Sequence, residues 1–223
     1  NEFIIEDFLE KVGDSSDCDS FSIDGKLKFV SFSAQKFDEN CENPYTPAAY
    51  TWPASISKIH QEELTNEIQR LLTLLNMKSS IYNIETRECT NGKAYIMECS
   101  PRGGGNRLAE MVRYMTGVDM ITNIVKVALG MEPDDINQQE IKDNWAEIIL
   151  HSEKEGTFEK LWISNEISSN IVENDLWIEA GTKVGGFAGA NEAIGTMVLK
   201  FDSEIQMNNV LNNQNNYIKV IVD

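Results

Sequence analysis

The sequence predicts an α+β protein built around an antiparallel sheet with flanking helices. Two dipeptides that favour tight turns, Asp24-Gly25 and Asn91-Gly92, each lie between strand-like runs and predict β-hairpins. Leucine and isoleucine recur at helical spacing between residues 64 and 75 and predict an amphipathic helix. Strand-like segments dominate beyond residue 130. We therefore expect one domain over residues 1–130 and a mostly antiparallel β domain over residues 131–223.

The elements of the first segment follow from local patterns. Residues 2–9 read as a strand, and residues 19–37 as a hairpin whose second strand ends at Lys36. A loop rich in proline and polar residues covers residues 39–52. The helix then begins near Ser55 or Ser57, either of which is a good N-cap, and runs to about residue 76.

Two helices and a series of strands complete the expected order. The helices cover residues 106–115 and 119–129, separated by a Thr-Gly pair. Strands are expected near residues 146–151, 158–163, 176–180, 195–201 and 217–222, with a short helix over 203–211. Glycines between residues 181 and 195 mark a loop, for which a lid and a surface hairpin are equally credible interpretations.

Two glutamates, Glu85 and Glu98, are expected face to face across the second hairpin. Asn91-Gly92 is a preferred centre for a two-residue type I′ turn, which pairs Thr90 with Lys93. Counting outward from that turn pairs Glu85 with Glu98. Directly opposed residues have Cβ atoms about 4.5–5.5 Å apart, and like charges placed there destabilise a sheet.

A divalent cation would hold the two carboxylates together. Mg²⁺ takes oxygen ligands, commonly one or two carboxylates together with substrate phosphates. In the alternative interpretation, a solvent-facing pair beside Arg87 needs no metal. The strand that carries Glu98 is apolar on both faces over residues 94–97, as buried strands are, and this favours the metal site.

These residues resemble the ATP-grasp ligases. The second half of that family has a hinge strand ending in Glu-x-Phe-Leu, a glutamate on a later strand, and a strand ending in Ile-Glu-x-Asn-x-Arg before a run of glycines. Here Glu6-Asp7-Phe8-Leu9 is similar to the hinge, Glu85 to the first glutamate, and Glu98 to Arg102 to the last motif. The stretch from Pro44 to Ser55 is similar to the amino-acid ligase and biotin-carboxylase-like branches. The resemblance covers about the first 130 residues well.

The resemblance implies a role for each matching residue. Glu85 and Glu98 would hold Mg²⁺, or Mn²⁺, against the phosphates of ATP. Arg102 would be the catalytic arginine, neutralising charge on the transferred phosphoryl group or the acyl substrate. The hinge residues Glu6, Asp7, Phe8 and Leu9 would bind the nucleotide, with the backbone of Asp7 and Leu9 at the adenine edge. Lys36 would face the phosphates or the acyl substrate, and a solvated lysine at a strand end is the alternative.

Three features near this motif leave alternatives open. Ser100 stands where the family usually has asparagine, a stronger ligand for a second metal ion. Asp14, Asp17 and Asp19 all lie near the place of the family's ribose-binding acid, and the sequence does not choose among them. The glycines at 103–105 precede a helix whose free N–H groups could bind an anion, or they form a plain entry turn.

The implied activity is that of an ATP-dependent carboxylate–amine ligase acting through an acylphosphate. A dipeptide-forming amino-acid ligase is favoured, because no feature for handling biotin or glutamine is visible. A carboxylase or carbamoyl-phosphate-type ATP-grasp enzyme and a non-catalytic ATP-grasp-like binding module are the alternatives. The family's phosphate-covering loop and two lysines precede the hinge. We therefore expect an N-terminal half of the same polypeptide as partner, and a fragment inactive alone.

Charge and composition limit the partners. The formal net charge of −17 is unsuited to a phosphate backbone, so no nucleic-acid partner is expected. No apolar run approaches a membrane span, so we expect no membrane partner and a cytoplasmic location. The expected substrates are a small-molecule carboxylate and an amine, and the resemblance also allows a homodimer.

Cysteine and histidine give little indication of a site in the sequence alone. The four cysteines form no C-x-x-C pair, and buried free thiols are favoured over disulfides or zinc. His60 follows the start of a helix among polar residues, where we expect it to be solvated, and His151 ends an apolar strand. With no pairing of histidines in sequence, a zinc site or a histidine-based triad has little support.

Overall fold

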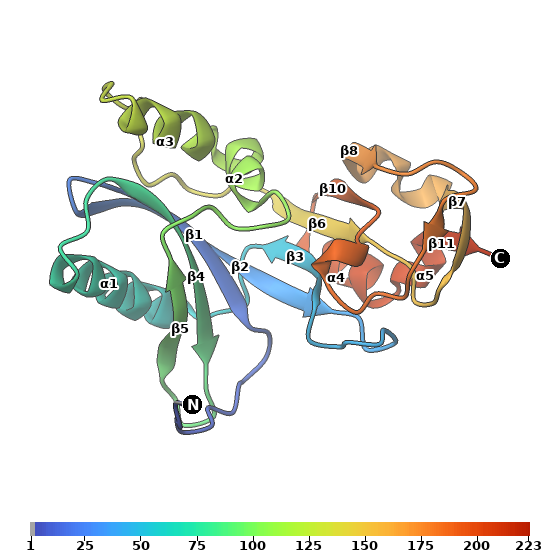
Figure 1. Cartoon of the computed structure of the whole chain (residues 1–223), viewed down its shortest axis with the longest axis horizontal. Helices are drawn as coiled ribbons and strands as arrows, with labels where there is room; N and C mark the ends of the chain where they lie inside the picture. The colour runs from blue at the N-terminus through green and yellow to red at the C-terminus, as the bar shows by residue number, and fades with distance from the viewer. Residues whose placement is uncertain (1–2) are drawn as a thin grey trace.

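The computed structural model describes residues 3–223 and has an α+β fold dominated by one antiparallel sheet (Figure 1). Its eight strands have the order β5-β4-β1-β2-β3-β6-β10-β8. They are β1 (Ser16–Ile23), β2 (Lys26–Phe37), β3 (Pro47–Trp52), β4 (Ser80–Glu88), β5 (Ala94–Ser100), β6 (Asn144–Leu150), β8 (Ile171–Leu176) and β10 (Gly195–Phe201). A second sheet has the order β11-β7-β9, with β7 (Gly156–Ile163), β9 (Lys183–Val184) and β11 (Ile218–Val222). The predicted α+β class with an antiparallel sheet is confirmed.

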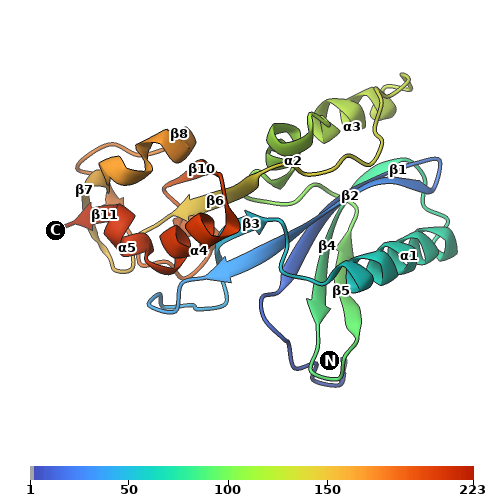
Figure 2. The same cartoon turned by 180° about the vertical axis from the view of Figure 1, so that it is seen from behind.

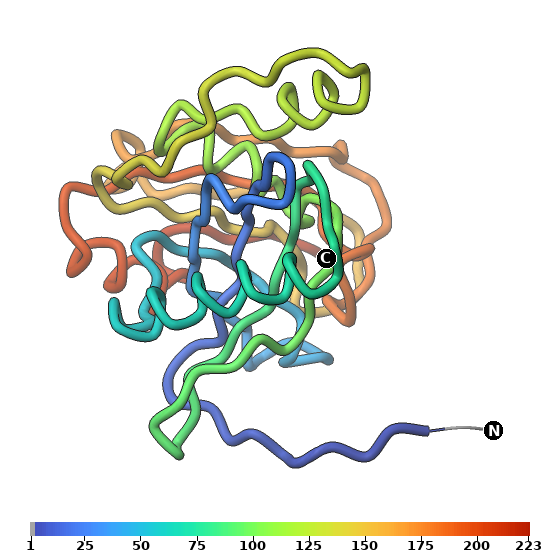
Figure 3. The backbone as a smooth tube through the Cα atoms, turned by 90° about the vertical axis from the view of Figure 1, so that its left-hand side faces the viewer, coloured from blue at the N-terminus to red at the C-terminus, as the bar shows by residue number. Residues whose placement is uncertain are grey.

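Helices cover both faces of the large sheet. They are α1 (Lys58–Leu74), α2 (Leu108–Thr116), α3 (Met120–Ala128), α4 (Glu204–Asn212) and α5 (Gln214–Tyr217), with short 3₁₀ turns η1 (Asn165–Asn170) and η2 (Ala190–Glu192). We call the face against which α2 and α3 pack the front face, and the face covered by α1 and α4 the back face. Figures 2 and 3 show α2 and α3 on one side of the sheet and α1 on the other.

Alternation along the strands separates the two faces and builds three apolar clusters. On β1, Cys18 points to the back face and packs with Leu64, Ile68 and Leu72 of α1. On the front face, Phe21 joins apolar side chains of α2 and α3. A third cluster lies under α4, where side chains of β6, β10 and the small sheet meet. Burying both faces leaves little room for polar side chains, so those that remain on the front face are informative.

The first hairpin and α1 form as their sequence signals predict. Asp24 and Gly25 have φ values of 51° and 77°, and Ile23 pairs with Lys26 across this two-residue turn. The Ser57 hydroxyl accepts a hydrogen bond from the backbone N–H of His60 and caps the helix. Of the two predicted capping residues, Ser57 is therefore the one used.

The second hairpin pairs Glu85 with Glu98 as predicted, although its turn differs from the prediction. The loop has three residues instead of two, because Cys89 donates its backbone N–H to the carbonyl of Lys93. Gly92 alone takes a positive φ there, at 75°. A β-bulge between Glu85 and Thr86 then restores the register, because Thr86 pairs with Ile96 and leaves Met97 as the extra residue on β5.

Four local predictions were wrong. The described part of residues 2–9 forms no strand, since no neighbour pairs with it, and Glu2 lies outside the described residues. Residues 47–52, predicted as loop, form β3 between β2 and β6. The strand predicted over 176–180 ends at Leu176 as part of β8. The strand that carries Glu98 was expected to be buried, but β5 is an edge strand and both Met97 and Glu98 are exposed.

The large sheet crosses the predicted domain boundary at residue 130. Residue 130 lies directly after α3. The strand β6, which follows this residue in the sequence, pairs with β3, which precedes it. β8 and β10 extend the same sheet, while β7, β9 and β11 form the separate small sheet. The division into domains over 1–130 and 131–223 stays a prediction.

Candidate functional site

The front face carries two rows of polar side chains across three neighbouring strands. In one row, Asp17 of β1 pairs with Glu85 of β4, which pairs with Glu98 of β5. In the next row, Asp19 pairs with Asn83, which pairs with Ser100. Residues two apart on a strand share a face, so all six side chains project from the front face. We call them the acidic face.

Asp17 and Asp19 are buried, and one amide joins them. The Asn83 side-chain amide donates to Asp17 Oδ1 at 2.6 Å and to Asp19 Oδ1 at 3.1 Å. The backbone N–H of Cys18 donates to Asp17, and that of Gly104 donates to Asp19 at 3.1 Å. These donors are neutral, so hydrogen bonds satisfy the two carboxylates without an ion pair within hydrogen-bond distance.

Burial changes the protonation of both aspartates. Burial, opposed by the hydrogen bond from Asn83, raises the pKa of Asp17 to about 6. The same two effects, together with the neighbouring charge of Asp17, raise the pKa of Asp19 to about 7. A cation placed beside these carboxylates would favour their ionised forms and lower both pKa values.

Glu85 and Glu98 form the outer, more exposed part of the acidic face. Arg87 Nη2 lies 3.5 Å from Glu85 Oε1, and the Ser100 hydroxyl donates to Glu98 Oε1 at 2.8 Å. Among residues 3–223, ligand atoms of three His, Cys, Asp or Glu side chains come within 4.8 Å of one another only at Asp38, Cys41 and His151. On the acidic face, no three such ligand atoms come this close within the described residues.

Arg102 and the glycine run lie beside the acidic face. Arg102 is exposed, its Nη1 donates to the carbonyl of Gly103 at 2.8 Å, and its charge lowers the pKa values of Asp17 and Asp19 against the larger effect of burial. A Cβ on Gly104 would lie 2.5 Å from Leu108 Cδ1 and 2.8 Å from Asp19 Oδ1, so a larger residue here would force these side chains to move. α2 begins at Leu108, two residues later than predicted, after Arg107 in a left-handed conformation.

A second polar group occupies the far end of the front face. Arg107 Nη1 donates to Glu173 Oε1 at 2.6 Å, and the Tyr114 hydroxyl also donates to Glu173. On β6, separated from Glu173 by β10, Glu147 is fully buried, and neither of its carboxylate oxygens has a hydrogen-bond partner. Burial raises the pKa of Glu147 well above its usual range, against a smaller opposing effect of the Arg107 charge. The sequence reasoning missed Glu147, and its only signal was one glutamate within an apolar strand.

The remaining predicted nucleotide-binding residues lie at the edge of this region. Lys36 Nζ forms a partly exposed ion pair with Asp14 Oδ2 at 2.6 Å near the end of β2, so its contact with a nucleotide or substrate stays a prediction. The carbonyl of Leu9 accepts from Arg87 at 3.4 Å. Glu6, Asp7 and Phe8 are exposed and make no hydrogen bond to other described residues, and Figure 3 shows this segment running away from the sheet.

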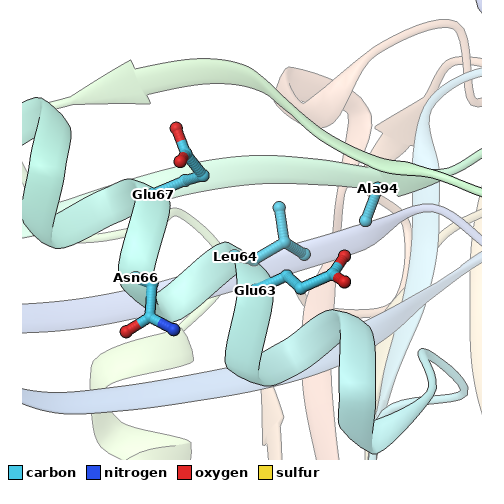
Figure 4. A pocket seen from close by; sticks show the side chains of 5 residues that line it. All are labelled: Glu63, Leu64, Asn66, Glu67 and Ala94. Atoms are coloured by element: carbon cyan, nitrogen blue, oxygen red, sulfur yellow. The ribbon is translucent and has the colours of Figure 1, made fainter.

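The back face has a hollow with different chemistry. A depression of about 310 Å³ lies between α1 and the start of β5 and is lined by Glu63, Leu64, Asn66, Glu67 and Ala94 (Figure 4). Its polar side chains are exposed residues of one helix and do not converge. His60, expected to be solvated, instead pairs with Glu88 at 2.5 Å beside the Ser57 cap. We assign no chemistry to this side of the sheet.

Comparison with solved structures identifies the fold. Phosphoribosylglycinamide synthetase from Anaerococcus prevotii matches with a TM-score of 0.79 and 20% identity, over 97% of this chain and 55% of that one. The L-amino acid ligase from Bacillus licheniformis matches with a TM-score of 0.79 and 18% identity, over 97% and 53%. Biotin carboxylase from Campylobacter jejuni, solved as a complex with beta-gamma-ATP, matches with a TM-score of 0.70 and 12% identity, over 97% and 48%.

The chain has the fold of the C-terminal portion of the ATP-grasp ligases. It spans about half the length of the three solved structures named above. No family model matches the sequence, and no curated protein matches it. Within residues 3–223, every helix is too short or too polar to cross a bilayer.

Proposed function

We propose that the acidic face binds Mg-ATP in a carboxylate–amine ligase of the ATP-grasp type, and that this chain supplies the C-terminal half of that enzyme. The observation that carries the proposal is the pairing of Glu85 with Glu98 on adjacent strands, directly beside the buried Asp17 and Asp19. Four carboxylates on one surface form an unfavourable arrangement unless a cation joins them. The fold supports the same class of enzyme.

Each residue of the acidic face then has a role. Glu85 and Glu98 hold the cation, which when bound neutralises phosphate charge and orients the reacting phosphate. Asn83 fixes the orientation of Asp17 and Asp19, which add negative potential behind that cation. Arg102 is exposed and carries no carboxylate partner in the described chain, so it is free to neutralise charge on the transferred phosphoryl group or on the acyl substrate.

The activated substrate would be a carboxylate. Its oxygen attacks the γ-phosphorus of ATP, ADP leaves, and an amine then displaces inorganic phosphate from the resulting acylphosphate to form an amide. Among such enzymes we favour a ligase that joins amino acids. Lys36 and the hinge segment at residues 6–9 would contact the nucleotide in the assembled enzyme.

We propose an N-terminal half of the same polypeptide as the partner that completes the nucleotide site. Phe3, Ile4, Ile5 and Phe8 have exposed fractions between 82% and 88%, in a segment that contacts little of the sheet. Apolar side chains exposed this fully gain free energy when another surface covers them. An added half that pairs with this segment would order it as the expected hinge strand.

Two experiments test the proposal at separate levels. Mn²⁺ binding to the 223-residue chain, followed by electron paramagnetic resonance, should weaken at least about tenfold in Glu98→Gln and Glu85→Gln. Glu173→Gln, a carboxylate at the far end of the same face, is the matched control and should bind Mn²⁺ as the parent chain does. Equal Mn²⁺ binding by Glu98→Gln and the parent would reject the site.

The second experiment tests the reaction. Phosphate release from ATP should be screened with amino acids, singly and in pairs, using the chain together with its N-terminal half. Release that depends on two amino acids supports the ligase. Release that instead requires bicarbonate would favour the carboxylase alternative.

A non-catalytic binding module is the second proposal, and Ser100 is the observation that favours it. Its hydroxyl is engaged with Glu98 at 2.8 Å, and a hydroxyl is a weaker ligand for a hard cation than an amide oxygen. Under this alternative, Mn²⁺ and ATP bind but no acceptor gives phosphate release. If the chain belongs to a binding module, Ser100→Asn, which introduces the asparagine usual in the family, should also give no phosphate release.

A further inference from the structure

A group of three side chains lies apart from the acidic face, where the loop after β2 meets the end of β6. Asp38, Cys41 and His151 place one carboxylate oxygen, one sulfur and one ring nitrogen within 4.8 Å of one another. Asp38 and His151 are 113 positions apart in sequence, so only the fold brings them together. Cys41 and the His151 side chain are both more than nine-tenths buried.

The His151 ring is held in the orientation of a metal-binding histidine. Its Nδ1 donates to the carbonyl of Ile149 at 2.6 Å, which directs Nε2 toward Asp38 Oδ2 at 3.2 Å. Phe187 stacks on the ring with centroids 4.0 Å apart and restricts its rotation. Metal-binding histidines commonly donate the other ring N–H to a carbonyl or carboxylate in this way.

The Asp38 carboxylate is held in place through both oxygens. Its Oδ1 accepts hydrogen bonds from the backbone and side-chain amides of Asn40 at 2.9 and 3.0 Å. Its Oδ2 pairs with His151 Nε2 at 3.2 Å. A cation bound between them would replace this contact, and the Cys41 sulfur lies within 4.8 Å of both atoms.

We propose that Asp38, Cys41 and His151 form a binding site for a borderline-soft divalent metal, Zn²⁺ in particular. Thiolate, imidazole and carboxylate are the ligands that zinc selects, whereas Mg²⁺ prefers oxygen ligands alone. Bond lengths of about 2.0–2.3 Å at tetrahedral angles put ligand atoms about 3.3–3.8 Å apart. The 3.2 Å between His151 Nε2 and Asp38 Oδ2 is close to this spacing, and the Cys41 sulfur lies within 4.8 Å of both atoms.

A cavity provides the entry path and the fourth coordination position. Asp38 and His151 line a cavity of about 410 Å³ that Glu153, Lys154 and Asn215 also line. The site therefore has three protein ligands and one position open to water or a small ligand, which is the arrangement of zinc sites that exchange ligands. The Cys41 thiol loses its proton to solvent when the metal binds.

Co²⁺ is the probe that separates this site from the acidic face. A thiolate bound to Co²⁺ gives a charge-transfer absorption in the near ultraviolet, and oxygen ligands do not. We expect the 223-residue chain to bind one equivalent of Co²⁺ with this absorption, and Zn²⁺ to displace it. Cys41→Ser should abolish the absorption. His151→Gln and Asp38→Asn should weaken Co²⁺ binding at least about 10–100-fold.

Matched variants exclude other sources of the signal. Cys89→Ser removes a different buried thiol, and His60→Gln removes the other histidine–carboxylate pair, so both should keep the absorption. Glu98→Gln should also keep it, because that residue belongs to the acidic face. Near-ultraviolet circular dichroism confirms that each variant is folded. The proposal is overturned if the parent chain gives no thiolate absorption, or if Cys41→Ser and His151→Gln both retain it.

Discussion

The two ends of the front face carry similar numbers of acidic side chains but balance their charge differently. At one end lie the four carboxylates of the acidic face, whose buried members accept hydrogen bonds from neutral donors. The two nearby arginines are Arg87, 3.5 Å from Glu85, and Arg102, which donates to a backbone carbonyl. At the other end, Glu173 has a short ion pair with Arg107 and a hydrogen bond from Tyr114. Arg107 also reaches Glu110, so its charge is fully used within the protein.

Under the proposed function, this difference separates a charge cluster that the protein balances itself from one that binds a cation. Glu173 has its pKa lowered by hydrogen bonds from Arg107 and Tyr114, as expected for a carboxylate satisfied by the protein itself. Asp17 and Asp19 have raised pKa values because burial is not offset by an adjacent positive charge. Under the proposed function a cation from outside the protein would balance the acidic face, whereas Arg107 already balances Glu173.

The largest expected effect is the loss of activity in Glu98→Gln. In the assembled enzyme we expect phosphate release to fall by about 100- to 1,000-fold, because an electrostatic contact to the reacting phosphate is lost. The matched change Glu173→Gln should retain phosphate release within a few-fold. Steady-state phosphate assays on both variants compare the two ends directly. Similar losses in the two variants would remove the distinction between them.

The next effect is a fall in stability with rising pH. The pKa values of Asp17 and Asp19 lie above the ordinary aspartate value of about 3.9, so the folded chain binds more protons than the unfolded chain between about pH 4 and 7. The free energy of unfolding should therefore decrease by a few kcal/mol as pH rises from about 5 to 8. Urea denaturation across this range measures the decrease.

Two additions sharpen the pH experiment. The double variant Asp17→Asn and Asp19→Asn should reduce the fall in stability, and Mn²⁺ should reduce it in the parent chain by binding the ionised carboxylates. Glu173→Gln should leave the slope unchanged, because the pKa of Glu173 is lowered and its titration lies below this range. An unchanged slope in the double variant would contradict the assignment of the raised pKa values.

A smaller effect is expected from Gly104→Ala. The added methyl group would lie 2.8 Å from both Asn83 Nδ2 and Asp19 Oδ1, and closer still to Leu108. We expect a loss of roughly 1–3 kcal/mol in the free energy of unfolding, from overpacking. Gly105→Ala is the control, because nothing lies within 4 Å of its added Cβ. Equal urea midpoints for the two variants would show that the glycine run is not packed against the acidic face.

The smallest expected effects come from two glutamates at the far end. Glu173→Gln should lower the free energy of unfolding by about 1–2 kcal/mol, because Arg107 loses a charged partner on a partly exposed pair. Glu147→Met should raise it by about 1 kcal/mol, since it replaces an unpartnered buried acid with an apolar side chain of similar size. Urea denaturation should give changes of opposite sign in the free energy of unfolding for the two variants. A lower free energy of unfolding in Glu147→Met would contradict this expectation.

Local chemistry in the sequence was sufficient for much of the fold. Positive-φ turn residues placed the Asp24-Gly25 hairpin, and helical spacing with a serine cap placed α1. β3 was missed because its six residues lie in a stretch rich in proline and polar residues, and its strand state depends on pairing with β2 and β6. The hinge segment was predicted as a strand from its apolar residues, yet it has no paired neighbour in the described chain.

The candidate site was predictable where its residues share one hairpin. The pairing of Glu85 with Glu98 was predicted by counting residues outward from the turn. Asn83 was not singled out, because its role depends on bridging two aspartates of β1. The sequence did not distinguish Asp17 and Asp19 from Asp14 as candidates for the ribose-binding acid. Only the pairing of β1 with β4 decides which of these carboxylates belong to the acidic face. The contact between Asp38 and His151 joins elements far apart in the chain, and local patterns carry no information about it.

The bulged residue Met97 has a consequence for comparing related sequences. The three-residue loop shifts the hairpin by one position, and the bulge shifts it back, so the two irregularities compensate. A relative with a two-residue turn and no bulge keeps its glutamates opposed at the same sequence spacing. A correct alignment therefore needs no gap in this hairpin, because a single gap at the loop would match Glu98 with a residue on the opposite face.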